Sequence, residues 1–182
     1  MGFDLYGLKP KDNEKPDTPD FLNDEEGAKA YFSWQENTDG AYFRNNVWWW
    51  RPLWNFICMV CDDILTNKDM ELGNENSGHI ISKTKAKRIA GRISRMDKNM
   101  EIKEYETNHK KFLESLDDED CNICDGTGKR KKAPEVGAGD IECNGCNGRG
   151  TRKHFSTNYP FDADNIRDFA KFCRNSGGFE IC

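Results

Sequence analysis

Two copies of one cysteine motif, whose first cysteines are 22 residues apart, constrain this chain more than any other feature. Both follow the pattern C-x-x-C-x-G-x-G, with Cys121 and Cys124 in the first copy and Cys143 and Cys146 in the second. Two residues between the cysteines let both sulfurs of a tight turn face one point, and the glycines allow backbone amides to turn towards the sulfurs. Two such turns provide four sulfurs, the closed tetrahedral ligand set of structural zinc sites.

We therefore expect Cys121, Cys124, Cys143 and Cys146 to bind one Zn²⁺ that has a structural role. The alternative is a redox dithiol, which needs a single C-x-x-C at the start of a helix rather than two matched copies. A catalytic zinc is disfavoured, because four cysteine ligands leave no open coordination position. The other four cysteines are scattered in apolar surroundings: Cys58, Cys61, Cys173 and Cys182.

The segment 121–150 resembles one zinc centre of the cysteine-rich domain of DnaJ-type (Hsp40) chaperones, in which this repeat occurs four times and binds two zinc ions. The resemblance implies a ligand role for the four cysteines and a hairpin-like shape. Two of the repeats and the His-Pro-Asp of the J-domain are missing, so chaperone activity is not implied.

The whole chain is also similar to small uncharacterised proteins of bacteriophages and bacteria. The similarity lies in the opening MGFDxYG, the stretch NNxWWWRPL and the ending SGGFxI. It implies action on a host component or a nucleotide-type ligand.

Composition excludes several classes of protein. At 182 residues the chain is long enough for one domain with a small insert, and 32% of its residues are charged. No apolar run approaches the roughly 18–20 residues of a membrane span, and the N-terminal sequence does not resemble a secretory signal. We expect a cytoplasmic protein in a reducing compartment, or the host cytoplasm if the chain is phage-encoded, with no membrane partner.

The hydrophobic pattern predicts an α+β fold: a small mixed domain with three to four helices and short terminal strands. This main domain comprises residues 1–120 and 155–182, and the zinc hairpin is an insert at 121–154. Residues 2–6 and 179–182 alternate apolar and polar side chains, so the two termini could pair as strands in one sheet.

Four helices and two long loops are predicted between these strands. The helices span about 52–65 with Pro52 in the first turn, a segment capped by Ser82, residues 101–116, and a segment capped by Asp162 or Asp164. The polar stretches 9–26 and 67–78 are predicted as surface loops. The apolar residues at helical spacing are Ala86, Ile89, Ala90, Ile93 and Met96 in the second helix, and Ile166, Phe169, Ala170 and Cys173 in the fourth.

Three consecutive tryptophans cannot all point into one core, so at least one ring should lie at a surface, an interface or a pocket. Flanking arginines and asparagines suit a flat ligand or a nucleobase, on which aromatic rings stack. The alternative is that the segment packs under the loop 9–26, with arginine stacked on tryptophan for structure. The candidate ligand-binding residues are Arg44, Asn45, Asn46, Trp48, Trp49, Trp50 and Arg51.

Charge is strongly segregated along the chain. Residues 1–39 carry 4 basic and 10 acidic side chains, whereas residues 81–100 carry 7 basic and 1 acidic. Such blocks are either solvated faces that complement each other or a basic surface for a phosphate-bearing partner. The candidate nucleic-acid or anion contacts are Lys83, Lys87, Arg88, Arg92 and Arg95, with Lys129, Arg130, Lys131 and Lys132 on the hairpin arm.

These observations predict a non-enzymatic binding or adaptor protein with no catalytic residues, whose partner is a protein or a nucleotide-type ligand. One alternative is a nucleic-acid-binding protein that uses the basic segments. Another is a small enzyme with a Trp/Arg-lined pocket and His79 or Asp62 as acid/base. Against the last, we expect His79 to be a surface loop residue, and His154 to find no vacancy beside four sulfurs.

Overall fold

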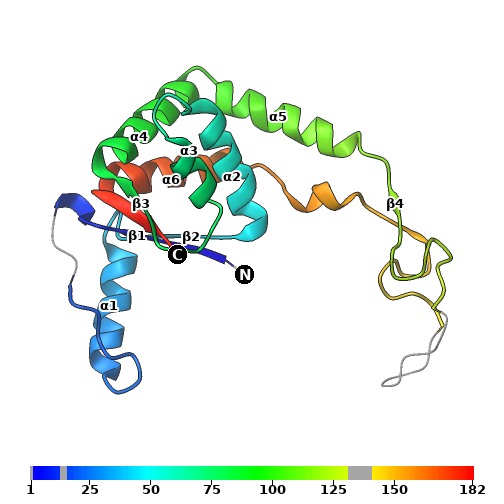
Figure 1. The fold of residues 1–182 in the computed structure, drawn as a ribbon, viewed down its shortest axis with the longest axis horizontal. Helices are drawn as coiled ribbons and strands as arrows, with labels where there is room; N and C mark the ends of the chain where they lie inside the picture. The colour runs from blue at the N-terminus through cyan, green and yellow to red at the C-terminus, as the bar shows by residue number, and fades with distance from the viewer. Residues whose placement is uncertain (1, 13–15, 131–140) are drawn as a thin grey trace. The chain divides into compact units, whose positions relative to one another are not determined.

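The computed structural model describes residues 2–12, 16–130 and 141–182. They form two compact units, one built from the chain up to Asn108 together with Tyr159–Cys182, the other from His109–Asn158. The described residues contain six α-helices and six short strands, which confirms the predicted mixed fold (Figure 1). The second unit contains both cysteine motifs, and the insert boundaries at 121 and 154 stay a prediction.

The first unit is built on a four-stranded antiparallel sheet with the strand order β2-β1-β6-β3. Its strands are β1 (Gly2–Gly7), β2 (Tyr42–Asn46), β3 (His79–Ser82) and β6 (Gly178–Ile181). The two terminal strands pair as predicted, with Leu5 opposite Ile181. Alternate side chains point to opposite faces of a strand, so Leu5 and Ile181 are buried on one face, while Tyr6 and Glu180 lie on the other.

Helices α2 (Val47–Val60), α4 (Lys83–Lys98) and α6 (Ala163–Asn175) pack on the buried face of this sheet, and α1 (Glu25–Asn37) lies on the other side (Figure 1). Aromatic rings fill the core between the sheet and the helices: Trp50 stacks on Phe3 and on Trp54, each with ring centroids 5.3 Å apart. The predicted apolar stripe of α6 is buried throughout, and that of α4 is buried up to Ile93, with Met96 partly buried.

The helix termini in the first unit follow the capping pattern of the sequence. Ser82 caps α4 by accepting a hydrogen bond from the Lys85 amide, and Asp162 caps α6 through the Asn165 amide at 2.9 Å. After α6 the chain turns at Gly177 and Gly178, whose φ angles of 68° and 96° favour glycine. The predicted helix 101–116 is α5 (Glu101–Glu114).

The tryptophan helix begins earlier than predicted. Asn46 caps α2 with its side chain, which accepts from the amides of Trp48 and Trp49 at 3.0 and 3.1 Å. Pro52 is therefore inside the helix rather than in its first turn. The Asn46 cap extends the helix backwards through all three tryptophans, even though proline provides no backbone donor.

Two helices and one strand replace predicted loops. The helix α1 (Glu25–Asn37) begins at the end of the predicted loop 9–26 and covers a stretch for which no element was predicted. The helix α3 (Asn67–Leu72) lies in the predicted loop 67–78, and β3 follows directly after that loop. In α1 only the side chains of Tyr31 and Gln35 are buried. A helix that buries so few side chains does not need a periodic apolar stripe, so its sequence gives no such signal. The short α3 is held by a capping box between Thr66 and Asp69.

The second unit contains the end of α5, the strands β4 (Glu119–Asp120) and β5 (Thr151–Arg152), and the 3₁₀ turn Phe155–Asn158. The two strands pair antiparallel, with Asp120 opposite Thr151, and lead into and out of the cysteine turns. Across the described parts of the chain, every helix is too short or too polar to cross a membrane.

Candidate metal centre

The two cysteine motifs form two turns with the same backbone hydrogen bonds. In the first turn the amides of Cys124 and Gly126 both point to the Cys121 carbonyl, at 3.2 Å each. In the second turn the corresponding amides of Cys146 and Gly148 point to the Cys143 carbonyl, at 3.3 and 3.1 Å. The repeat in the sequence is thus a repeat in structure.

The turns are joined to each other by a reciprocal pair of hydrogen bonds. The Cys121 amide donates to the Gly150 carbonyl at 2.8 Å, and the Cys143 amide donates to the Gly128 carbonyl at 2.9 Å. A Cβ atom on Gly128 would lie 2.3 Å from the Gly148 carbonyl oxygen, and one on Gly150 equally close to that of Gly126. The last glycine of each motif is therefore needed for the close approach of the two turns.

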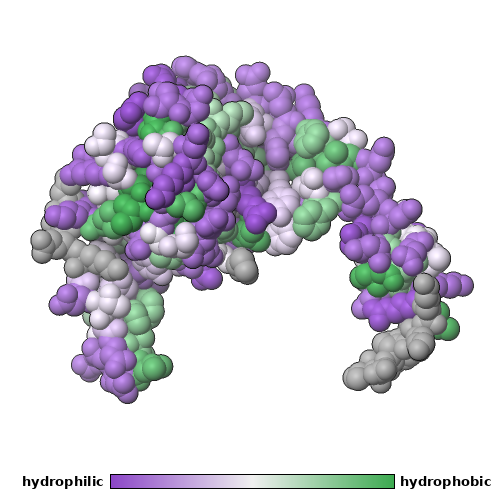
Figure 2. Space-filling view, viewed as in Figure 1, coloured by the Kyte–Doolittle hydropathy of each residue, from purple (hydrophilic) through white to green (hydrophobic). Residues whose placement is uncertain are grey.

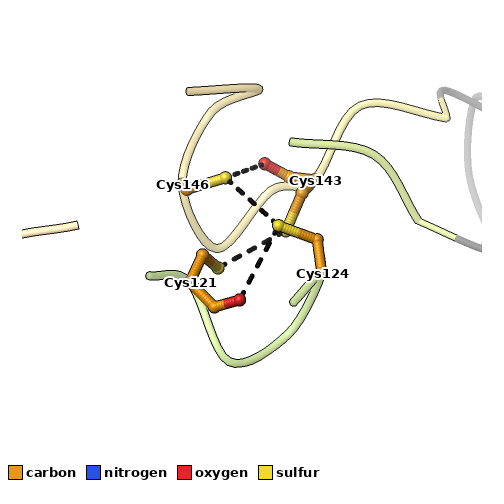
Figure 3. A group of neighbouring side chains, drawn as sticks. All are labelled: Cys121, Cys124, Cys143 and Cys146. Atoms are coloured by element: carbon orange, nitrogen blue, oxygen red, sulfur yellow. Dashed lines mark hydrogen bonds between the residues drawn. The ribbon is translucent and has the colours of Figure 1, made fainter. Parts of the chain in front are cut away.

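The four cysteine side chains converge on one point (Figure 3). All four sulfurs lie within 4.8 Å of one another, and two pairs, Cys121 with Cys143 and Cys124 with Cys146, are 3.8 Å apart. A tetrahedron with metal–sulfur bonds of about 2.3 Å has edges of about 3.8 Å. The spacing of the sulfurs therefore matches a ligand set around one metal ion, and the candidate ligands predicted from the sequence are brought together.

Backbone amides support the negative charge that such a ligand set carries. The amide of Gly128 donates to the Cys124 sulfur, and that of Gly150 to the Cys146 sulfur, both at 3.2 Å. A hydrogen bond from the Ile123 amide lowers the pKa of the Cys121 thiol to about 7, whereas burial raises that of Cys146 to about 11. A divalent cation would favour the thiolate at all four positions.

The residues present fit a tetrahedral thiolate metal. The candidate group consists of four buried cysteines, a donor set typical of zinc or of iron in a sulfur environment. His154 stands apart from this group and contacts Glu119, with 3.2 Å between its Nε2 and the carboxylate. All eight cysteines are free thiols, so no disulfide competes with metal binding within the described residues.

The tryptophan segment divides between core and surface. Trp50 is fully buried and its indole N–H donates to the Gly73 carbonyl at 2.8 Å, whereas Trp48 is 37% exposed and contacts the Tyr159 ring. The expectation that at least one ring reaches the surface is confirmed for Trp48. Trp49 is half-buried and Arg51 is exposed.

The polar residues of this segment have structural partners. Asn46 caps α2, and the Asn45 amide donates to the Asn165 side chain at 3.0 Å. The Arg44 guanidinium lies 3.4 Å from the Asp4 carboxylate. A ligand pocket around 44–51 stays a prediction.

Acidic side chains neutralise part of the basic helix. Arg92 donates two hydrogen bonds to the Asp63 carboxylate, at 2.8 and 2.9 Å, and Arg88 lies 3.5 Å from the same group. Lys83, Lys87 and Arg95 are exposed on α4. Complementary faces therefore explain at least part of the charge segregation, and nucleic-acid binding stays a prediction.

The basic arm of the hairpin is described in part. Arg130 donates to the Asn144 side chain, and Lys129 is exposed. Lys131 and Lys132 lie outside the described residues. On the neighbouring arm, Arg149 donates to the Cys146 carbonyl at 3.2 Å and Lys153 pairs with Asp118 at 2.7 Å.

The expectation of a surface loop is wrong for His79, which lies on β3 with its side chain 12% exposed. Its Nε2 is 3.0 Å from the carboxylate of Asp69, and the same carboxylate accepts from Lys85 and from the Thr66 amide and hydroxyl. Burial opposes ionisation of Asp69, but these hydrogen bonds outweigh it and hold its pKa well below the usual range.

Sequence reasoning missed this buried ionic cluster, whose carboxylate is Asp69 and not the exposed Asp62. The available signal was the spacing Thr66-x-x-Asp69, a variant of the capping box at the start of a helix.

Comparison with known proteins adds no family: no protein-family model, no curated protein and no solved structure matches this chain.

Proposed function

We propose that this chain is a zinc protein, in which one structural Zn²⁺ bound by Cys121, Cys124, Cys143 and Cys146 organises the second unit for a binding role. The observation that carries the proposal is the convergence of four buried sulfurs with tetrahedral spacing. Zinc is the metal for which a closed set of four thiolates is a common structural site.

A structural role follows from the coordination. Four protein sulfurs leave no position for water or substrate, so the ion cannot act as a Lewis acid or generate hydroxide. The ion instead supplies folding free energy. In zinc-finger peptides the apparent free energy of Zn²⁺ binding is roughly 10–16 kcal/mol. This is large compared with what the glycine-rich turns can gain from apolar burial.

The binding role is supported by the structural contacts that engage the candidate acid/base and aromatic residues. His79 and Asp69 are engaged with each other and nearly closed to solvent, and the indole N–H groups of Trp50 and Trp54 donate to backbone carbonyls. We propose a non-enzymatic adaptor in the cytoplasm, or in the host cytoplasm if the chain is phage-encoded. The similarity of its layout to bacteriophage proteins supports a host component as the partner.

Metal analysis of the purified protein tests the zinc proposal. We expect one zinc per chain by elemental analysis, and replacement by Co²⁺ should give the visible absorption of a tetrahedral cobalt–thiolate centre. The variant Cys124→Ser/Cys146→Ser should lose the metal. Cys58→Ser is the matched control, because Cys58 is a free, half-buried thiol outside the group, and it should keep the full metal content. A metal-free wild type, or disulfides among the four cysteines, would overturn the proposal.

A further inference from the structure

Two adjoining hollows lie where α1 meets the sheet face that the core helices leave open. The first, of about 250 Å³, is lined by four aromatic rings and by Thr18, Gln35, Glu180 and Cys182. The second, of about 200 Å³, shares Gln35 and two of the rings and adds Glu36 and Tyr42. The rings of the first hollow belong to Tyr6, Phe21, Tyr31 and Phe32. Each hollow therefore combines aromatic rings with a glutamate carboxylate, and Gln35 is common to both.

Gln35 is the residue that marks this place as a binding site. Its side chain lies in both hollows and the residue is 9% exposed, yet none of the described residues forms a hydrogen bond with its amide group. The polar atoms of this amide are not sealed from solvent. Because Gln35 lines both hollows, its amide can form hydrogen bonds with a group bound there.

The electrostatics of the hollows favour a cation. Over the described parts of the chain no ion pair or hydrogen bond reaches the Glu180 carboxylate, which is half-buried on β6. Glu36 provides a second carboxylate at the other hollow, and residues 1–39 carry 4 basic and 10 acidic side chains. On the neighbouring strand β2, Arg44 pairs with the Asp4 carboxylate at 3.4 Å.

The walls offer exposed aromatic surface to the same ligand. Phe21 and Phe32 stack with ring centroids 5.4 Å apart, and they are 47% and 52% exposed. Hydrophobic side chains gather beside α1 and at its far end in the space-filling view (Figure 2). A cation over an aromatic face is attracted by the ring quadrupole, and the planar guanidinium group stacks on such faces better than ammonium does.

We propose that these hollows bind the guanidinium group of an arginine side chain presented by a peptide segment. Glu180 and the Gln35 carbonyl oxygen accept its N–H groups, the aromatic rings hold its plane, and the Gln35 amide donates to a carbonyl of the ligand. A volume of about 250 Å³ is below the usual range for whole small-molecule ligands and suits one side chain. The inference deepens the binding role proposed above and rests on it, but it does not involve the metal.

The test is a titration of the zinc-loaded full chain with the blocked peptide acetyl-Gly-Arg-Gly-amide. Binding is measured by calorimetry and by changes in the NMR signals of the Gln35 side-chain NH₂. The same peptide with citrulline keeps the shape and removes the charge, and ethylguanidinium supplies the guanidinium group without any backbone carbonyl. We expect citrulline to weaken binding at least about tenfold, because hydrogen bonds to a charged group are lost.

Variants locate the site. Glu180→Gln and Gln35→Leu should each weaken arginine binding about tenfold. Glu26→Gln is the matched control for charge, since Glu26 is exposed on α1 and lies outside both hollows, and it should leave the affinity unchanged within about twofold. The citrulline comparison decides the question even if Gln35→Leu fails to fold.

The outcomes separate this inference from the metal proposal. Tighter binding of the peptide than of ethylguanidinium assigns the site to a protein partner. Equal binding of the two overturns that assignment and gives the site to a small guanidinium compound. Equal affinity for arginine and citrulline, unchanged binding by Glu180→Gln, or no binding at all overturns the inference while leaving the zinc centre intact. Arginine binding in a chain that proves to lack metal overturns the zinc proposal alone.

Discussion

At the scale of single residues, the glycines that end the two cysteine motifs leave no room for a side chain. Gly128 has a φ angle of 72°, which L side chains rarely adopt, and its Cα faces a carbonyl oxygen of the opposite turn. Gly91 is the opposite case, because it is exposed in α4 and a Cβ there would meet nothing within 4 Å. The two glycines therefore predict opposite effects of the same substitution.

We predict that Gly128→Ala weakens the second unit by at least about 2 kcal/mol, through backbone strain and the contact with the Gly148 carbonyl. The apparent zinc affinity, measured by competition with a chelator, should fall at least about thirtyfold, because metal binding and folding of this unit are coupled. An unchanged affinity would contradict the close packing of the two turns.

In contrast, Gly91→Ala should stabilise the first unit by about 0.5–1 kcal/mol, because alanine restricts the unfolded chain and suits a helix interior. Denaturant unfolding followed by tryptophan fluorescence measures this change. A destabilised variant would mean that another part of the chain approaches Gly91.

At the scale of elements, the sequence predicts best where burial repeats with a regular period. The sequence predicts the buried positions of α4 and α6 from their helical period, and those of β1 and β6 from their alternation. This succeeds because each of these elements packs one face against the same core. The helices α1 and α3 could not, since α1 buries few side chains and α3 depends on one cap. The four metal ligands were predictable from spacing alone. Gln35 and Glu180 were not, because their neighbours in the hollows are distant in sequence, whereas Asp69 carried only the local capping-box signal with Thr66.

The buried cluster that joins α3, β3 and α4 gives a prediction of its own. Asp69→Asn removes the charge that holds His79 and Lys85, and should destabilise the first unit by about 1–3 kcal/mol. Because the folded-state pKa of Asp69 is lowered, its carboxylate stabilises the wild type fully above the unfolded pKa of about 4 and loses this effect as pH falls below it.

The difference in unfolding free energy between wild type and Asp69→Asn should therefore shrink as the pH falls below about 4. Unfolding of the first unit, measured at a series of pH values with the metal chelated throughout, tests this. Asp62→Asn is the control, because Asp62 is exposed and should show no such difference. A difference that stays constant down to pH 2 would show that the pKa of Asp69 is not involved.

At the scale of the whole molecule, the two units differ in what holds them together. Among the residues that the structure describes, the first has one continuous core of 25 buried residues, which includes the rings of Trp50, Trp54 and Phe169. The buried cluster found in the second consists of the four cysteines themselves. An apolar core stabilises in proportion to the area it buries, whereas four thiolates without a metal have no comparable gain.

Removing the metal should consequently destabilise the second unit and leave the stability of the first unit unchanged. We predict that a chelator raises hydrogen exchange at the amides of Cys121, Gly128, Cys143 and Gly150 towards unfolded rates. Amides in β1 and β6, such as those of Leu5 and Ile181, should keep their protection, because their burial does not depend on the metal. The double variant Cys124→Ser/Cys146→Ser should show the same pattern without chelator. Loss of protection in both units would mean that the metal also stabilises the aromatic core.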